Sequence, residues 1–117
     1  MSTEEILEKK VEQELVDAVE SLGGECLKLE VKGRRGWPDR LCLLPEGITI
    51  CVEVKRRSGQ LSKAQEARLR TLHHMGHLHV VVWDIHQVNQ LAFMMQKMIH
   101  AAQSTRSLRG GMMTTGY

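Results

Sequence analysis

The segment ITICVEVK, residues 48–55, constrains the fold of this chain more than any other stretch. Its β-branched residues predict a strand, in which successive side chains point to opposite faces of a sheet. One face carries the aliphatic side chains of Ile50, Val52 and Val54. The other carries Glu53 and Lys55, about 6.5–7 Å apart along the backbone. A core strand that places a carboxylate beside an amine requires an explanation beyond hydrophobic burial.

The pattern of apolar residues predicts one α/β domain, with a central mixed β-sheet flanked by helices in the order α-β-β-β-α-β-α. The expected helices cover residues 4–22, 62–75 and a stretch from Asp84, and the expected strands cover 26–31, 39–44, 48–55 and 77–83. The sequence PEG at 45–47 forms the turn of a hairpin. The domain is expected to span residues 1–103, and residues 104–117, which lack periodicity, to form a flexible tail.

The composition excludes several classes of protein. Of the 117 residues, 42% are apolar and 26% are charged, as in ordinary globular proteins. No apolar run approaches the roughly 20 residues that cross a bilayer, and the acidic, amphipathic N-terminus is unlike a signal or transit peptide. A cytoplasmic location is therefore expected. The cysteines, Cys26, Cys42 and Cys51, lack CxxC spacing and are interpreted as reduced core thiols.

The net charge of +2 conceals an asymmetry along the chain. Residues 1–27 contain eight acidic and two basic side chains, whereas residues 28–70 contain five acidic and eleven basic ones. A basic surface suits a phosphate-rich partner, because Lys and Arg displace the counterions condensed on nucleic acid. The asymmetry alone is a weak indication, since solvated faces are often charged.

The predicted hairpin brings Asp39 beside the end of the strand that carries Glu53. Two nearby carboxylates repel unless a cation lies between them, and a hard cation such as Mg²⁺ prefers oxygen ligands. Such an ion polarises a phosphate oxygen and activates water, and Lys55 could orient that water or neutralise charge on the phosphorus. The simpler interpretation is a Glu53–Lys55 ion pair on an exposed edge strand.

Three stretches together carry a more specific signal: GRRGWPDR at 33–40, CVEVKRRSGQLSKAQ at 51–65 and LHHMGHLHVVVW at 72–83. In this combination they resemble the VRR-Nuc domain of the PD-(D/E)XK nuclease superfamily, over residues 8–83. The resemblance implies a restriction-endonuclease-like core and a metal-dependent nuclease.

The resemblance also implies the roles of individual residues. Asp39, Glu53 and the main-chain carbonyl of Val54 would hold a Mg²⁺ or Mn²⁺ ion, and Lys55 would be the catalytic lysine. Val54 stands where the family typically has Leu, a change that leaves the chemistry unaltered.

Two supporting residues are expected near the same site. The family has a glutamate on the first helix that faces the site, and Glu12 is the first choice here and Glu8 the second, because both flank the apolar arc of the helix. Gln65 lies three residues after Ser62, the spacing of a capping box. The resemblance adds a possible role for Gln65 in holding the site or a water. One side chain is not expected both to cap the helix and to serve the site.

Basic residues surround both halves of the candidate site. Those expected to grip flanking phosphates, and so to set position rather than sequence, are Arg34, Arg35, Arg40, Arg56, Arg57 and Lys63. Trp37 either stacks on an exposed base or packs beneath its loop. The histidines of HHMGHLH, residues 73–79, are not expected to form a metal site, because two end a helix and two lie on a strand.

The sequence therefore predicts a Mg²⁺- or Mn²⁺-dependent DNA endonuclease without an organic cofactor or a membrane partner. The resemblance implies that stand-alone members act as homodimers on branched DNA such as four-way (Holliday) junctions, where two-fold symmetry places two active sites on two strands. It also suggests a phage-type protein in a bacterial host cell. Two alternatives stay open: a non-catalytic nucleic-acid-binding module, and a nuclease acting on RNA or on linear DNA ends.

Overall fold

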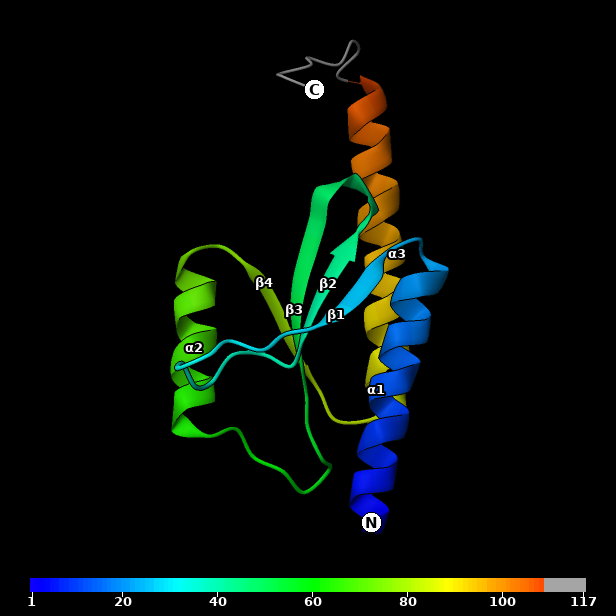
Figure 1. The fold of residues 1–117 in the computed structure, drawn as a ribbon. Coiled ribbons are helices and arrows are strands. Elements are labelled where there is room, and N and C mark those ends of the chain that lie inside the picture. The colour runs from blue at the N-terminus through cyan, green and yellow to red at the C-terminus, as the bar shows by residue number, and fades with distance from the viewer. Residues whose placement is uncertain (109–117) are drawn as a thin grey trace.

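The computed structural model describes residues 1–108, with side chains through Thr105, and the described chain forms a sheet with helices on both faces (Figure 1). The helices are α1 (Thr3–Ser21), α2 (Lys63–His74) and α3 (Ile85–Leu108), and the strands are β1 (Glu25–Lys28), β2 (Arg40–Leu44), β3 (Ile48–Val54) and β4 (Leu78–Val82). This is the predicted order of elements, and the α/β fold class is confirmed.

The sheet is mixed, with the strand order β1-β2-β3-β4. β1, β2 and β3 pair antiparallel, and a one-turn 3₁₀ segment at Pro45–Gly47 joins β2 to β3 where the PEG turn was predicted. β4 pairs parallel with β3, which requires a crossover, and α2 supplies it. β3 therefore lies inside the sheet, and the interpretation of Glu53 and Lys55 as an ion pair on an edge strand is wrong.

The main core lies between the sheet and the pair α1 and α3, which run side by side on one face (Figure 1). Leu15 and Val19 of α1 and Val88 and Met95 of α3 are buried against Val52 of β3. The apolar side chains that recur along one face of each helix thus cover the aliphatic face of β3. α2 lies on the opposite face of the sheet (Figure 1).

Two boundaries differ from the sequence prediction by three residues or more, and the others that differ do so by one. β1 ends at Lys28, three residues earlier than the strand predicted to reach Val31. α3 runs to Leu108, so the domain boundary predicted at residue 103 falls inside a helix. The hydroxyls of Ser104 and Thr105 donate to the carbonyls of His100 and Ala101 four residues earlier, which satisfies these polar groups within the helix. The remainder of the predicted tail, 109–117, lies outside the described residues.

The three cysteines are free thiols, as predicted, with Cys42 and Cys51 buried and Cys26 half-buried. Cys26 and Cys42 are cross-strand partners in β1 and β2, with their sulfur atoms 3.8 Å apart. Among residues 1–108, no helix has the length and apolar character needed to span a membrane.

The loop between β1 and β2 is fastened to the start of α2. Gly36 adopts φ +87°, and a Cβ atom placed there would lie 2.3 Å from the carbonyl oxygen of Ala64. Only glycine permits this close approach of two backbones. The contact fixes the loop just ahead of Asp39, whose own carbonyl accepts a hydrogen bond from the amide of Leu29 at 2.8 Å.

We predict that Gly36→Ala lowers the free energy of unfolding by several kcal/mol, because it combines left-handed strain with a backbone clash. Gly33→Ala is the matched control, since Gly33 has a similar φ of +73° but nothing within 4 Å of the added Cβ. It should cost only about 1–2 kcal/mol. Urea unfolding of both variants tests this, and equal losses would contradict the close contact between the loop and α2.

Candidate active site

A cleft of about 260 Å³ opens at the end of the sheet where β3 ends and β2 begins. Its lining comes from α1, α2 and three strand ends, and comprises Glu8, Glu12, Lys28, Asp39, Glu53, Val54, Lys55 and Gln65. The structure thus brings together the residues predicted to be catalytic or to ligate metal. They are up to 53 positions apart in the sequence, from Glu12 to Gln65.

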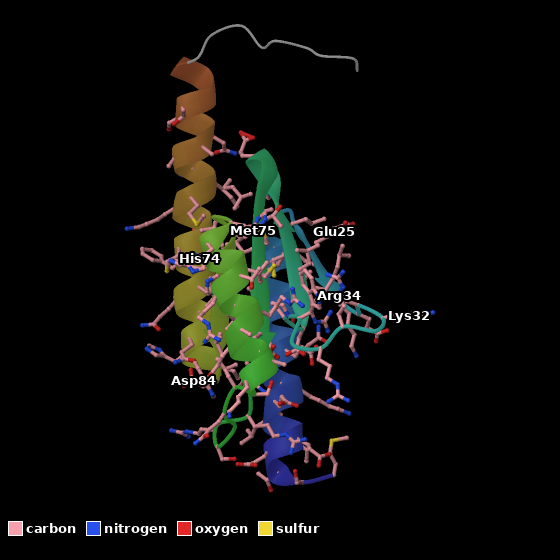
Figure 2. All side chains as sticks on the ribbon, turned by 90° about the vertical axis from the view of Figure 1, so that its left-hand side faces the viewer. Glu25, Lys32, Arg34, His74, Met75 and Asp84 are labelled. Atoms are coloured by element: carbon pink, nitrogen blue, oxygen red, sulfur yellow. The ribbon has the colours of Figure 1, made fainter. Side chains whose placement is uncertain are left out.

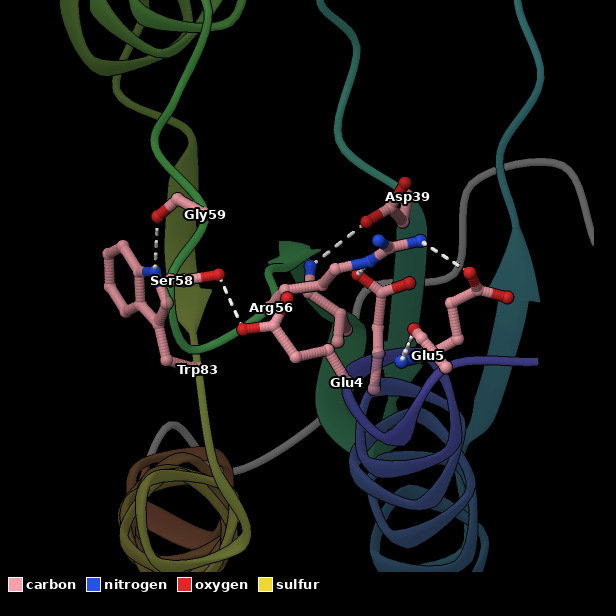
Figure 3. A network of polar contacts seen from close by, with 10 residues as sticks. Glu4, Glu5, Asp39, Arg56, Ser58, Gly59 and Trp83 are labelled. Atoms are coloured by element: carbon pink, nitrogen blue, oxygen red, sulfur yellow. Dashed lines mark hydrogen bonds and ion pairs between the residues drawn. The ribbon is translucent and has the colours of Figure 1, made fainter.

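The register of β2 and β3 places the two central carboxylates opposite each other. The antiparallel ladder pairs Arg40 with Val52, and one step outward Asp39 faces Glu53. Beyond the ladder, the Asp39 carboxylate oxygen Oδ2 accepts a hydrogen bond from the Val54 amide at 3.0 Å (Figure 3). This bond anchors the Asp39 side chain to the end of β3.

Glu53 is only 3% exposed, which is unusual for a carboxylate. The amide nitrogen Nε2 of Gln65 donates to its oxygen Oε2 at 3.2 Å. Burial and then the neighbouring Asp39 carboxylate raise the pKa of Glu53 to about 9, against the opposing effects of Lys55 and Gln65. The protein therefore holds a carboxyl group where its ionised form is disfavoured unless positive charge is supplied.

These donors fit a hard divalent cation. A cation between Asp39 and Glu53 would offset both the burial of Glu53 and the repulsion by Asp39, and both residues offer oxygen ligands. Residues 1–108 contain no cluster of three or more His, Cys, Asp or Glu side chains suited to a metal, so the histidines at 73–79 form no such cluster either. Two carboxylates, a main-chain carbonyl and waters are a typical set for Mg²⁺.

Gln65 fills both of the roles that were expected to exclude each other. Its Oε1 accepts a hydrogen bond from the backbone amide of Ser62 at 2.9 Å. The Ser62 hydroxyl in turn accepts from the backbone amide of Gln65, which completes the capping box of α2. Its Nε2 donates to Glu53. The expectation of a single role was wrong, because the carboxamide oxygen binds Ser62 while the carboxamide nitrogen binds Glu53.

Glu12 reaches the cleft from α1 but is bound to Arg40. The guanidinium group of Arg40 contacts Glu12 Oε1 through Nη2 at 2.8 Å and Nε at 2.9 Å, and Nη1 donates to the carbonyl of Cys26 at 3.3 Å. The Arg40 side chain is only 17% exposed. Arg40 therefore ties α1 and β1 to the start of β2. Glu8, the second choice for the helix glutamate, also lines the cleft.

The other predicted phosphate-binding residues lie on surrounding loops. Arg34, Arg35, Arg57 and Lys63 are exposed, and Arg34 lies on the loop between β1 and β2 (Figure 2). Arg56 is exposed but contacts acidic residues of α1, with nitrogen–oxygen distances of 3.9 Å to Glu5 and 3.7 Å to Glu8.

The structure adds one lining residue that the sequence did not predict, and it bears on the two interpretations of Trp37. Lys28 lines the cleft because the β1 register sets it opposite Arg40, a pairing that could not be assigned without the position of β1 in the sheet. Trp37 is half-buried, with the guanidinium carbon of Arg68 4.5 Å from its ring centroid. This favours the interpretation of Trp37 as a residue that packs its loop against α2.

Comparison with known proteins gives an independent result. No protein-family model matches the chain. "Putative nuclease p44" of Acyrthosiphon pisum secondary endosymbiont phage 1 is 36% identical over 86 residues, which cover 74% of this chain and 91% of that protein. A solved structure described as "VRR_NUC domain" is similar with a TM-score of 0.69 and 33% identity, over 72% of this chain and 91% of its own. The chain belongs to the VRR-Nuc family.

Membership of the VRR-Nuc family confirms the resemblance seen in the sequence. This VRR-Nuc domain is a nuclease, and its substrate is nucleic acid. The cleft described above is the part of the domain that collects the residues which the family motif predicted, so it is the candidate active site of the VRR-Nuc domain.

We predict that the metal-free VRR-Nuc domain loses stability as pH rises, owing to Glu53. The pKa of Glu53 is raised from 4.5 to about 9 in the folded state, so folding takes up a proton between these values. The contribution is full below pH 4.5 and is lost as the pH approaches 9. Melting temperatures in EDTA should fall over this range in wild type and in the surface control Glu66→Gln, and less steeply in Glu53→Gln. Parallel profiles for all three proteins would contradict the raised pKa of Glu53.

We predict that Gln65→Glu separates the two roles of Gln65. A glutamate can still accept from the Ser62 amide, but it cannot donate to Glu53 and adds a third carboxylate. The loss of unfolding free energy should be about 1–3 kcal/mol at neutral pH and should shrink in acid. Ser62→Ala, which removes the cap alone, should cost about 1 kcal/mol with little dependence on pH. Urea unfolding at two pH values checks this, and identical pH behaviour of the two variants would exclude the contact with Glu53.

Proposed function

We propose that this VRR-Nuc domain is a Mg²⁺- or Mn²⁺-dependent endonuclease that hydrolyses phosphodiester bonds in branched DNA, such as four-way junctions. The observation that carries the proposal is the meeting of Asp39 and Glu53 at one end of the sheet, with Lys55 lining the same cleft. A purely structural site would not require two facing carboxylates, one of them buried.

Asp39, Glu53 and the carbonyl of Val54 are the groups that would hold the ion. When bound, a divalent cation lowers the pKa of a coordinated water and polarises a phosphate oxygen. The chain's own residues do the remainder. The hydrogen bonds from the Val54 amide to Asp39 and from Gln65 to Glu53 orient both carboxylates before substrate arrives.

Lys55 comes two residues after Glu53, just beyond the end of β3, and lines the cleft. The Lys55 backbone amide donates to the carbonyl of Val82 at 2.9 Å, so the residue continues the pairing with β4 and its position is fixed. Its ammonium group would donate to a phosphate oxygen in the transition state, where negative charge builds up. The ion pair of Glu12 with Arg40 joins α1 to the first residue of β2 beside the cleft.

A homodimer would extend the surface that this domain offers to branched DNA. The described domain has principal extents of 53 × 29 × 22 Å, so one copy covers little of a duplex. A second copy related by two-fold symmetry would double the surface and bring two clefts to two strands of a junction. The exposed Phe93 and Met94 of α3 offer apolar surface for such contacts. The enzyme would act in the cytoplasm of a bacterial host, where phage DNA is processed.

We predict that Lys55→Ala reduces the rate of cleavage by about 10²-fold or more while junction binding is retained. Asp39→Asn should abolish metal-dependent cleavage. Lys10→Ala, a change on the exposed face of α1, is the control and should leave the rate unchanged. The assay incubates each protein with a labelled four-way junction, linear duplex, single strands and RNA, in Mg²⁺, Mn²⁺ or EDTA.

Each alternative gives its own pattern in this assay. Binding without cleavage in either metal identifies a non-catalytic module. Preferential cleavage of RNA or of duplex ends identifies the other alternative. Paired nicks placed symmetrically on the junction support the homodimer.

A further inference from the structure

A second pocket, of about 200 Å³, adjoins the candidate active site and shares Lys55 and Glu8 with it. Three segments form its walls: the first half of α1, the residues that follow β3, and the connection from β4 to α3. The lining residues, in chain order, are Glu4, Leu7, Glu8, Val11, Lys55, Arg56, Arg57, Trp83, Asp84 and Ile85. The pocket therefore lies beside the residue proposed to contact the scissile phosphate.

Two of the apolar residues that line this pocket, Leu7 and Ile85, lie outside the buried core, whereas Val11 belongs to it. Leu7 is 49% exposed and Ile85 is 41% exposed, although both continue apolar stripes of their helices. The N-terminal end of α1 extends beyond the edge of the sheet (Figure 1), so the apolar residues at this end of the helix have no strand to pack against. Apolar side chains gathered in a concave site beside a charged cleft are typical of a ligand pocket.

Trp83 is held in place on two sides. Its indole Nε1 donates to the carbonyl of Gly59 at 3.2 Å (Figure 3), and its backbone amide donates to Gln87 Oε1 at 2.6 Å. The first bond joins the indole to the basic loop after β3. Trp83 is half-buried and lines the pocket, so its ring is a fixed aromatic surface on which a flat partner could stack.

The acidic groups at the rim are engaged with partners. Glu4 accepts a hydrogen bond from the Ser58 hydroxyl at 2.5 Å (Figure 3), Glu8 contacts Arg56, and Asp84 Oδ1 accepts from the Gln87 amide at 2.8 Å. Lys55 and Arg57 add positive charge to the same rim. An apolar interior suits the flat face of a nucleobase. Lys55 and Arg57 at the rim suit the phosphates that flank a nucleotide within a DNA strand.

We propose that this pocket binds one unpaired nucleobase of the DNA, next to the phosphate that is cut. The inference rests on the proposed function and refines its substrate class to DNA with an unpaired or displaced nucleotide at the cleavage point. A volume of about 200 Å³ suits a single ring system and is too small for a helix or for a drug-sized ligand. In a paired duplex the base stays in its stack and cannot reach the pocket.

The test uses tryptophan fluorescence in EDTA, so that it does not depend on cleavage. The chain has two tryptophans, and Trp37→Phe leaves Trp83 as the only one. This protein is titrated with a short duplex that carries one unpaired adenine and with the same duplex fully paired. We expect quenching of Trp83 by the first duplex and at least ~10-fold weaker binding of the second, in line with the strength of base–aromatic stacking.

Leu7→Ser in the same background should remove most of this preference. Ile6→Ser is the matched control, because Ile6 is a similarly exposed apolar residue on α1 that does not line the pocket. Neither change touches a buried residue, so both proteins should fold. Leu7→Ser should lower affinity for the unpaired substrate about 10-fold and leave that for the paired duplex unchanged.

Other outcomes overturn the inference in distinguishable ways. Equal affinity for both duplexes, or an equal loss for both in Leu7→Ser, refutes the base pocket while leaving the nuclease proposal intact. Conversion of a dimer to a monomer by Leu7→Ser, measured by sedimentation, assigns the pocket to contact between two copies instead. A failure to bind any DNA refutes the proposed function and the pocket together.

Discussion

The structure depends on one electrostatic constraint: a buried glutamate, Glu53, lies opposite Asp39 at the end of the central strands. Burial and the facing carboxylate each disfavour the charged form of Glu53, and its pKa is raised to about 9. Such an arrangement costs stability in isolation. It is sustained because surrounding elements each contribute a hydrogen-bond donor or a fixed stretch of backbone.

The supports converge from parts of the chain that are distant in sequence. α2 brings Gln65, whose two carboxamide ends join its own helix cap to Glu53. The loop before Asp39 is held by the close approach of Gly36 to the first turn of α2. Arg40 ties α1 to the first residue of β2. All three contacts fix elements that line the same cleft. Loss of any one of them therefore disturbs the positions of the cleft residues.

Much of this site could be predicted from sequence because it depends on local periodicity. The alternation in residues 48–55 correctly separates Val52 from Glu53, and the hairpin turn correctly brings Asp39 to Glu53. The dual role of Gln65 was missed, since sequence spacing reveals the helix cap but not the strand beneath it. The partner of Arg40 was missed for a similar reason: nothing local indicates that its guanidinium turns inward to Glu12. Leu7 belongs to a helical stripe by its spacing, yet only the packed structure shows that the sheet ends before reaching it.

Membership of the VRR-Nuc family establishes a nuclease, and the facing carboxylates of the cleft are the geometric basis for proposing that a cation is shared between them. The most direct measurement is a crystal structure of the protein grown with Mn²⁺, with an anomalous difference map recorded at the manganese absorption edge. The account predicts a peak between the carboxylates of Asp39 and Glu53, within about 2–2.5 Å of an oxygen from each. A map with no peak there, or with manganese bound elsewhere while these two side chains stay as described, would contradict it.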